Sequence, residues 1–143
     1  MLRRVDAARA LADLTEISSQ VVQVAVVDAD GGVLASTIEP EARARRFVDV
    51  VARLVEEADT TRSARGLADL AQLEAATLEG SVFVVRDPDR GRTIAATTLP
   101  DPTVGLVFYD LKHCLRSIAT EEKPAAAAPA PAARRRRKAD GAA

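Results

Sequence analysis

Tryptophan is absent from this 143-residue chain, aromatic residues make up only 3% of it, and there is one cysteine and one histidine. A single cysteine excludes an intrachain disulfide and favours a reducing compartment. Metal and catalytic sites built from several histidines or cysteines are excluded by the same scarcity. Because aromatics are so few, alanine, valine and leucine must form the core, which is typical of thin layers of helix on sheet.

Long apolar runs are also lacking, since none approaches the roughly 18 residues that a membrane span needs. The first residues, Met1–Arg4, include two arginines, but Asp6, Arg9 and Asp13 interrupt any apolar segment behind them. This pattern is not that of a signal peptide. The sequence therefore predicts a soluble, cytoplasmic protein.

The net charge of −1 conceals an asymmetry along the chain. The last twenty residues carry a net charge of +4, from Arg134–Lys138 against Asp140, and the remainder carries −5. A mildly acidic folded part is a poor binder of the phosphate backbone. We therefore expect no specific nucleic-acid binding.

Two β-branched runs, Val21–Val27 and Val33–Ile38, are separated by Asp28–Gly32. Valine and isoleucine favour extended backbone, and Asp and Gly supply the side-chain bonds and positive φ of a tight reversal. The first run is apolar on both faces, so it is predicted to be an interior strand, in the middle of a sheet, covered on both sides. The aspartates are predicted to form the turn, since their spacing does not match a calcium loop.

Helical periodicity marks three further segments, at residues 2–17, 40–58 and 101–119. The second should begin with Pro40 at its first position, and the third should have Asp101 as its N-cap. Residues 82–85 and 93–99 are predicted to form a second hairpin. The middle helix has an apolar stripe wider than one buried seam requires, which suggests burial against more than one neighbour, including a second copy of the chain.

Residues 67–78 allow two interpretations. Ala, Leu, Gln and Glu are good helix formers, and Leu70 and Leu73 fit one helical face. Alternation of Leu73 and Ala75 with Gln72 and Glu74 fits an exposed or edge strand instead. The local pattern slightly favours the helix, and pairing within a sheet could overrule it.

From residue 121 onward the chain is rich in Ala and Pro and ends in a basic block. Nothing there can bury a core, so we expect a folded domain over residues 1–120 and a disordered tail over residues 121–143. Arg134–Lys138 could bind an anionic surface at roughly 1 kcal/mol per basic residue. A tether or a solubility segment is the simpler interpretation.

The order of elements resembles the roadblock/LC7 (dynein light chain-like, MglB-like) domain family. Residues 24–36, VAVVDADGGVLAS, look like that family's first hairpin, and residues 104–111, VGLVFYDL, look like the start of its last helix. The resemblance implies an α/β (α+β) fold: one five-stranded antiparallel sheet sandwiched by helices, in the order αββαβββα. It also implies that residues 67–78 form the third strand, at the edge of the sheet.

Members of that family are non-catalytic homodimers that regulate or scaffold small Ras-like GTPases. In them the edge strand pairs with its copy, and the two long helices pack together. The resemblance thus predicts a homodimer that binds a small GTPase, with no catalytic residue, cofactor or metal. It assigns the dimer interface to Phe47, Val48, Val51, Leu54, Val55, Leu73 and Ala75.

The charged face of the middle helix is the predicted partner surface, although an ordinary solvated face fits the same pattern. An arginine finger could lie on it, but the sequence singles out none. The alternative function is a small-ligand sensor of PAS or GAF type, which begins with a similar hairpin and would need a closed apolar pocket. The residues of the predicted partner surface are Arg43, Arg46, Asp49, Arg53 and Glu56.

His113 and Cys114 are neighbours near the end of the last predicted helix. Adjacent helical residues project about 100° apart, so these two do not form a catalytic pair. His113 is predicted to be exposed, and Cys114 is predicted to serve packing.

Overall fold

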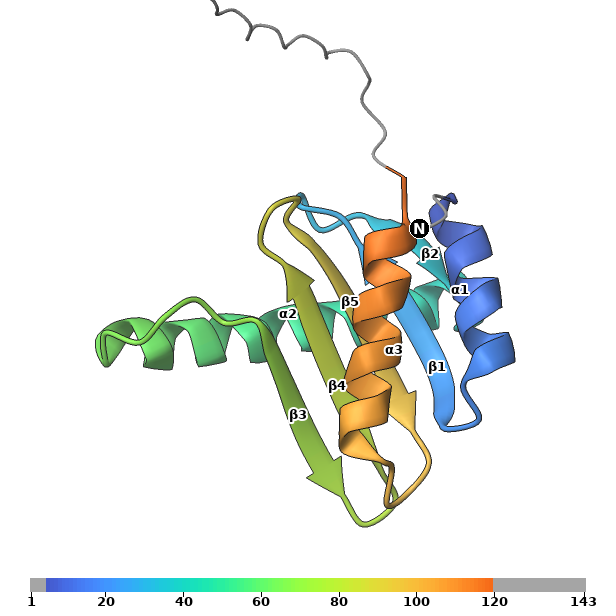
Figure 1. Ribbon diagram of the computed structural model, residues 1–143. Coiled ribbons are helices and arrows are strands. Elements are labelled where there is room, and N and C mark those ends of the chain that lie inside the picture. Colours follow the sequence, from blue (N-terminus) through green and yellow to red (C-terminus); the bar gives the residue numbers. More distant parts are fainter. Residues whose placement is uncertain (1–4, 120–143) are drawn as a thin grey trace, which may run out of the picture.

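The computed structural model describes residues 5–119, which form three helices and one five-stranded sheet in the predicted order αββαβββα (Figure 1). Residues 1–4 and 120–143, which include the predicted tail, lie outside the described part. The elements are α1 (Ala7–Ile17), β1 (Val21–Val27), β2 (Val33–Ser36), α2 (Glu41–Ala64), β3 (Gln72–Thr77), β4 (Gly80–Asp87), β5 (Arg92–Thr98) and α3 (Val104–Ser117).

All neighbouring strands are antiparallel, and their order across the sheet is β2-β1-β5-β4-β3. β1 is an interior strand, as predicted, because it pairs with both β2 and β5. The central position belongs to β5, which has two strands on each side. The edges are β2, which has four residues, and β3, which has six. Pairing with β4, from Gln72 opposite Val85 to Thr77 opposite Gly80, holds residues 72–77 as a strand despite their helix-forming composition.

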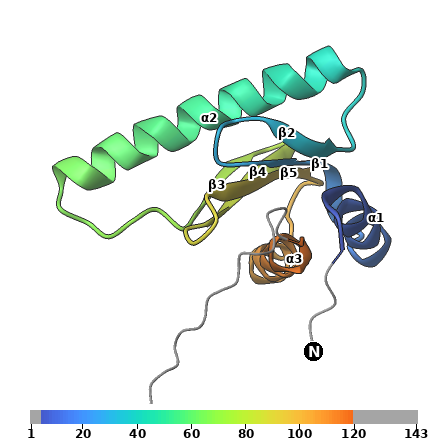
Figure 2. The same cartoon turned by 90° about the horizontal axis from the view of Figure 1, so that it is seen from above.

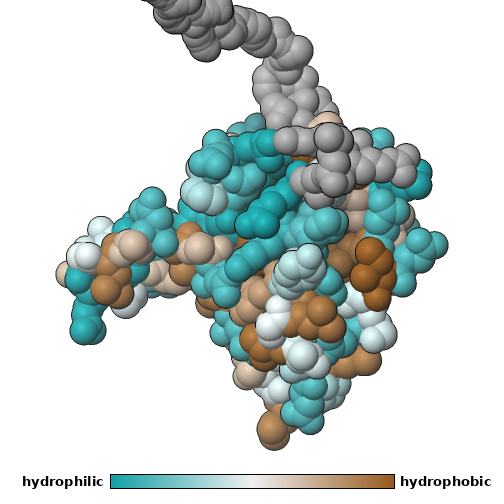
Figure 3. All heavy atoms as spheres, viewed as in Figure 1, coloured by the Kyte–Doolittle hydropathy of each residue, from teal (hydrophilic) through white to brown (hydrophobic). Residues whose placement is uncertain are grey.

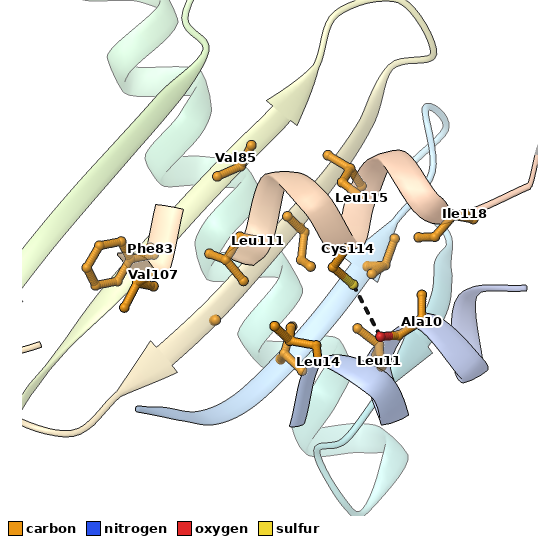
Figure 4. Packing of buried hydrophobic residues seen from close by; sticks show 14 residues of the cluster. Ala10, Leu11, Leu14, Phe83, Val85, Val107, Leu111, Cys114, Leu115 and Ile118 are labelled. Atoms are coloured by element: carbon orange, nitrogen blue, oxygen red, sulfur yellow. Dashed lines mark hydrogen bonds between the residues drawn. The ribbon is translucent and has the colours of Figure 1, made fainter. Parts of the chain in front are cut away.

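The helices cover the two faces of the sheet unequally (Figure 2). α1 and α3 lie side by side on one face and enclose the main core, a cluster of fourteen buried residues. Phe83, Ile94 and Leu111 are its largest fully buried side chains, and the ring of Phe83 meets that of Phe108 edge to face with centroids 4.9 Å apart. The close packing between α1 and α3 is drawn in Figure 4.

α2 lies alone on the opposite face, and it is longer than predicted. It begins at Glu41, with Pro40 as its N-cap rather than its first residue, and it continues to Ala64 rather than ending near residue 58. Its 24 residues span about 36 Å. Its C-terminal part projects beyond β3 (Figures 1 and 2). Between α2 and the sheet lie two small clusters of three buried residues each.

Of two local predictions from the sequence, the Asp-Gly reversal is confirmed and the N-cap of α3 is wrong. Asp28 accepts hydrogen bonds from the backbone N–H groups of Asp30 (3.1 Å) and Gly32 (3.3 Å), and Gly31 takes a φ of 92°, so the predicted Asp-Gly reversal is confirmed. Asp101 is not an N-cap: α3 begins at Val104, after Thr103. The backbone N–H of Thr103 is instead bound by the side chain of Gln20, which fixes the start of α3 from a distant segment.

Candidate dimer and partner-binding surfaces

α2 buries one side of itself against its own sheet. Val48 packs against buried residues of β1, and Val51 packs against buried residues of β4 and β5. Each is only 4% exposed in the single chain. The burial of these two valines is therefore complete within one protomer. Both valines stabilise the protomer itself, and their assignment to the dimer interface stays a prediction.

The apolar stripe of α2 continues past this buried side onto one flank. Phe47, Leu54 and Val55 are half-buried, and Val50 is 55% exposed. Val50 and Leu54 are four residues apart, so they lie next to each other on the helix surface. An exposed apolar flank beside a buried one is the surface that a second helix would cover.

β3 leaves one edge of the sheet open. It pairs with β4 on one side, and no described residue pairs with its outer edge. Leu73 packs with the cluster under α2, and Ala75 shares its face because alternate strand residues point the same way. Both are half-buried. Unpaired edges of this length readily accept another strand.

The residues of the predicted partner surface all lie on α2, outside the side that Val48 and Val51 bury. All five are exposed. Arg45, which the sequence did not indicate, pairs with Asp49 (3.0 Å) and also donates to the carbonyl oxygen of Gly31 (3.2 Å). Among residues 5–119, Arg43, Arg46 and Arg53 enter no ion pair, which leaves three guanidinium groups on this face for acidic or phosphate partners.

An ion-pair network ties the projecting end of α2 to the sheet. Asp59 accepts from Arg62 (3.0 Å) and from Arg86 of β4 (2.9 Å). These bonds, the one from Arg62 first, lower the pKa of the Asp59 carboxyl below its ordinary value. Asp59 and Arg86 are 27 residues apart in the chain, so local patterns in the sequence carry no signal of this contact.

The region around His113 and Cys114 offers packing rather than catalysis. His113 is exposed and stacks on Tyr109, with ring centroids 6.3 Å apart. Cys114 is 4% exposed and donates to the carbonyl oxygen of Ala10 across 3.5 Å (Figure 4). Burial raises the pKa of this thiol to about 12. Within residues 5–119 no group of three or more potential ligands is gathered for a metal ion, and no helix has the length and apolarity to cross a membrane.

Comparison with solved structures identifies the fold. A roadblock/LC7 domain from Streptomyces avermitilis superposes with a TM-score of 0.70 and 15% identity, covering 79% of this chain and 94% of that one. The gliding protein MglB from Thermus thermophilus gives a TM-score of 0.65 and 13% identity, covering 81% and 91%. A structure of MglB with tetrameric arrangement gives 0.64 and 14%, covering 79% and 88%.

The chain therefore has the roadblock/LC7 fold, as the resemblance of its sequence predicted. At these identities the likeness establishes the fold alone. No family profile matches the sequence, and no curated protein does.

Proposed function

We propose that the protein is a non-catalytic, homodimeric regulator or scaffold that binds a small Ras-like GTPase in the cytoplasm. The observation that carries this proposal is the α2 face of a roadblock/LC7 fold: an exposed apolar flank, an open β3 edge and, among the described residues, a solvent side with three unpaired arginines. The tetrameric arrangement of an MglB structure supports self-association in this fold.

The dimer is formed by the flank of α2 together with the outer edge of β3. Phe47, Val50, Leu54 and Val55 lie against the partner's α2, with Leu73 and Ala75 beneath them. Pairing of the two β3 strands would satisfy backbone N–H and C=O groups that one chain leaves open. Burying the half-exposed aliphatic side chains would contribute about 25 cal/mol for each Å² removed from water.

The GTPase binds on the solvent side of α2, through Arg43, Arg46 and Arg53. Guanidinium groups form bidentate bonds with carboxylates and phosphates, so this face suits an acidic surface or the nucleotide itself. Asp49 is already paired with Arg45, which makes it a positioning residue for that neighbour rather than a direct ligand. Glu56 would contact a basic group of the partner.

The sensor alternative has less support. A PAS- or GAF-type sensor holds its ligand in an apolar space between sheet and helices. Here side chains fill the space beneath α1 and α3, where Phe83, Ile94 and Leu111 are 0% exposed. This packing favours the scaffold or regulator function.

The dimer is tested by size-exclusion chromatography with light scattering. The wild-type chain is expected at twice the 15.1 kDa of the monomer. Leu54→Asp should give monomers, because a carboxylate cannot be buried unpaired between two helices. Val50→Asp should act in the same direction without harming the protomer, since Val50 is exposed within it.

A matched control is Ala52→Asp, which adds the same charge to an exposed position on the opposite flank of α2. It should remain a dimer. A wild-type monomer at high concentration would overturn the dimer, as would equal effects of Leu54→Asp and Ala52→Asp. Val51→Asp is not a suitable test, because Val51 is buried inside the protomer and its loss would unfold the chain.

GTPase binding is tested by calorimetry with purified Ras-like GTPases of the same organism, loaded with GDP or a non-hydrolysable GTP analogue. One of them should bind. The triple variant Arg43→Ala, Arg46→Ala, Arg53→Ala should weaken binding at least about 10-fold, because the loss of even one charge-assisted bond changes the affinity by that factor. Arg90→Ala, on the β4–β5 turn, is the control. Measuring GTP turnover with and without the protein separates a regulator from a pure scaffold. Binding to none of the GTPases would refute this part of the proposal.

A further inference from the structure

An apolar groove of about 350 Å³ runs between α1 and α3, on the face of the molecule opposite α2. Its floor includes Ala10, Leu14 and Cys114, all buried, and Ile17 at one end is 69% exposed. In Figure 3 apolar side chains on this side gather over α3 and beside α1. The proposed dimer and GTPase surfaces do not include this groove.

Acidic groups line the groove, and basic groups do not. Asp13 and Glu16 of α1 face Asp110 of α3 across it, and no lysine or arginine is among its lining residues in the described part of the chain. The basic residues of α3, Lys112 and Arg116, line a separate cavity on the side toward β4. Arg9 pairs with Asp13 (3.2 Å), whereas Glu16 and Asp110 have no ion-pair partner among residues 5–119.

The described chain ends at the mouth of this groove. Val5 and Ser117 line that end, and the N–H of Val5 donates to the carbonyl oxygen of Ser117 (2.9 Å). The N–H of Ala119, the last described residue, donates in turn to the carbonyl oxygen of Val5 (2.7 Å). Buried Arg92 donates to the carbonyl oxygens of Ile118 (3.3 Å) and Ala119 (3.1 Å), so the exit point of the chain is fixed.

The sequence beyond Ala119 has the length and the composition to occupy the groove. Fourteen residues, 120–133, separate the exit from the basic block at 134–138. Fourteen residues can reach about 43 Å in extended polyproline II backbone, which exceeds the length of α3, about 21 Å. The intervening Ala/Pro run is apolar, and proline-rich segments dock on aromatic side chains. His113, which lines the groove, offers such a ring and stacks on Tyr109.

We propose that the C-terminal segment of the same chain docks in the α1–α3 groove, with its Ala/Pro run on the apolar floor and Arg134–Lys138 against Glu16, Asp13 and Asp110. Tethering gives the segment an effective concentration on the order of millimolar, so individually weak contacts suffice. Docked in this way, the basic block is withheld from other anionic surfaces. The proposal does not depend on the dimer or on GTPase binding.

Paramagnetic relaxation enhancement tests the proposal in the full chain. A nitroxide is attached to Ala139→Cys, next to the basic block, and Cys114 stays unlabelled because it is buried with a thiol pKa of about 12. Mass spectrometry of the wild-type chain after the same treatment checks this selectivity. At low salt the amide signals of residues 10–17 and 106–117 should lose most of their intensity, and they should recover near 1 M salt, where the screening length falls to about 3 Å.

The matched variants reverse charge in two places. Glu16→Lys with Asp110→Lys should restore the lost signals, whereas Glu56→Lys with Glu79→Lys, at exposed positions outside the groove, should not. Loss of signal elsewhere, no loss at all, or equal effects of the two double variants would overturn the proposal. A mixture of nitroxide-labelled chains with isotope-enriched unlabelled chains shows whether the segment comes from the same chain or from another copy. Loss of the groove signals in this mixture would mean that another copy's segment fills the groove, which also contradicts docking in the same chain.

Discussion

The two faces of the sheet differ in how many apolar side chains the single chain buries on them. The α1–α3 face has two helices, fourteen buried residues in one cluster, and ends that are tied together by the Val5–Ile118 bridge. The α2 face has one helix, six buried residues in two clusters, and an apolar flank open to solvent. The larger core lies beneath α1 and α3, whereas α2 buries a smaller one and leaves an apolar flank beside it.

This difference shows that the apolar periodicity of a helix can serve packing within the chain and can also leave apolar residues on the surface. α3 has one apolar stripe, and the structure buries most of it, from Val107 to Leu115. α2 has a wider stripe, of which Val48 and Val51 are buried while Val50 and Leu54 remain accessible on one flank. A stripe wider than the protomer covers supports the proposed contact with a second copy of the chain.

The largest expected effect comes from a matched pair of leucines on the two faces. Leu111→Ala removes a fully buried side chain from the α1–α3 core and should cost about 2–5 kcal/mol of unfolding free energy. Leu54→Ala, the same change on the open flank, should cost less, and its cost should shrink on dilution because a part of it acts through association.

Urea unfolding at two protein concentrations makes this comparison. The cost of Leu111→Ala should be the same at both concentrations. If Leu54→Ala destabilises a dilute, monomeric sample as much as Leu111→Ala does, the two faces are equally complete within one chain, and the contrast between them is wrong.

Much of the fold was predictable because short stretches of neighbouring residues determine the type of each element. The valine runs and the Asp-Gly turn fix the first hairpin, and the apolar repeats fix α2 and α3. β3 was not decided by its own residues, since Gln72–Thr77 are mostly good helix formers. Their pairing with β4 and the packing of Leu73 under α2 are tertiary contacts, which local propensity does not contain.

The surfaces were predicted less completely than the fold. The periodic stripe of α2 identified the apolar positions, but spacing could not tell Val48 and Val51, which face the sheet, from Val50 and Leu54, which border it. Asp101 has the chemistry of an N-cap, yet distant Gln20 holds the start of α3 at Thr103 instead. Arg92 lies in a turn-like stretch of sequence, and only the fold shows that it is buried.

A smaller effect is expected from Arg92, which closes the α1–α3 face where the described chain ends. The Arg92→Gln variant loses two charge-assisted bonds to the last carbonyl oxygens of the described chain, which should cost roughly 1.5–3 kcal/mol. Hydrogen exchange should accelerate at Val5 and at residues 117–119. Arg90→Gln, two residues away on the turn, should change stability by no more than about 0.5 kcal/mol. Unchanged exchange at Val5 in Arg92→Gln would show that this end is held without the guanidinium.

The smallest expected effect concerns Asp59, which ties the projecting end of α2 to β4 through Arg62 and Arg86. Its pKa is lowered in the folded protein, so the carboxylate stabilises the fold above the ordinary value of 3.8, and this contribution disappears as the pH falls through the lower folded value. Asp59→Asn should therefore lower the thermal midpoint slightly at pH 7 and not at all well below pH 3.8. Glu56→Gln, in the same helix and without an ion-pair partner among the described residues, corrects for general effects of charge. If the thermal midpoints of Asp59→Asn and wild type still differ in acid, hydrogen-bond geometry rather than charge holds α2 at this point. Packing, and not ion pairing, would then position α2 on the sheet.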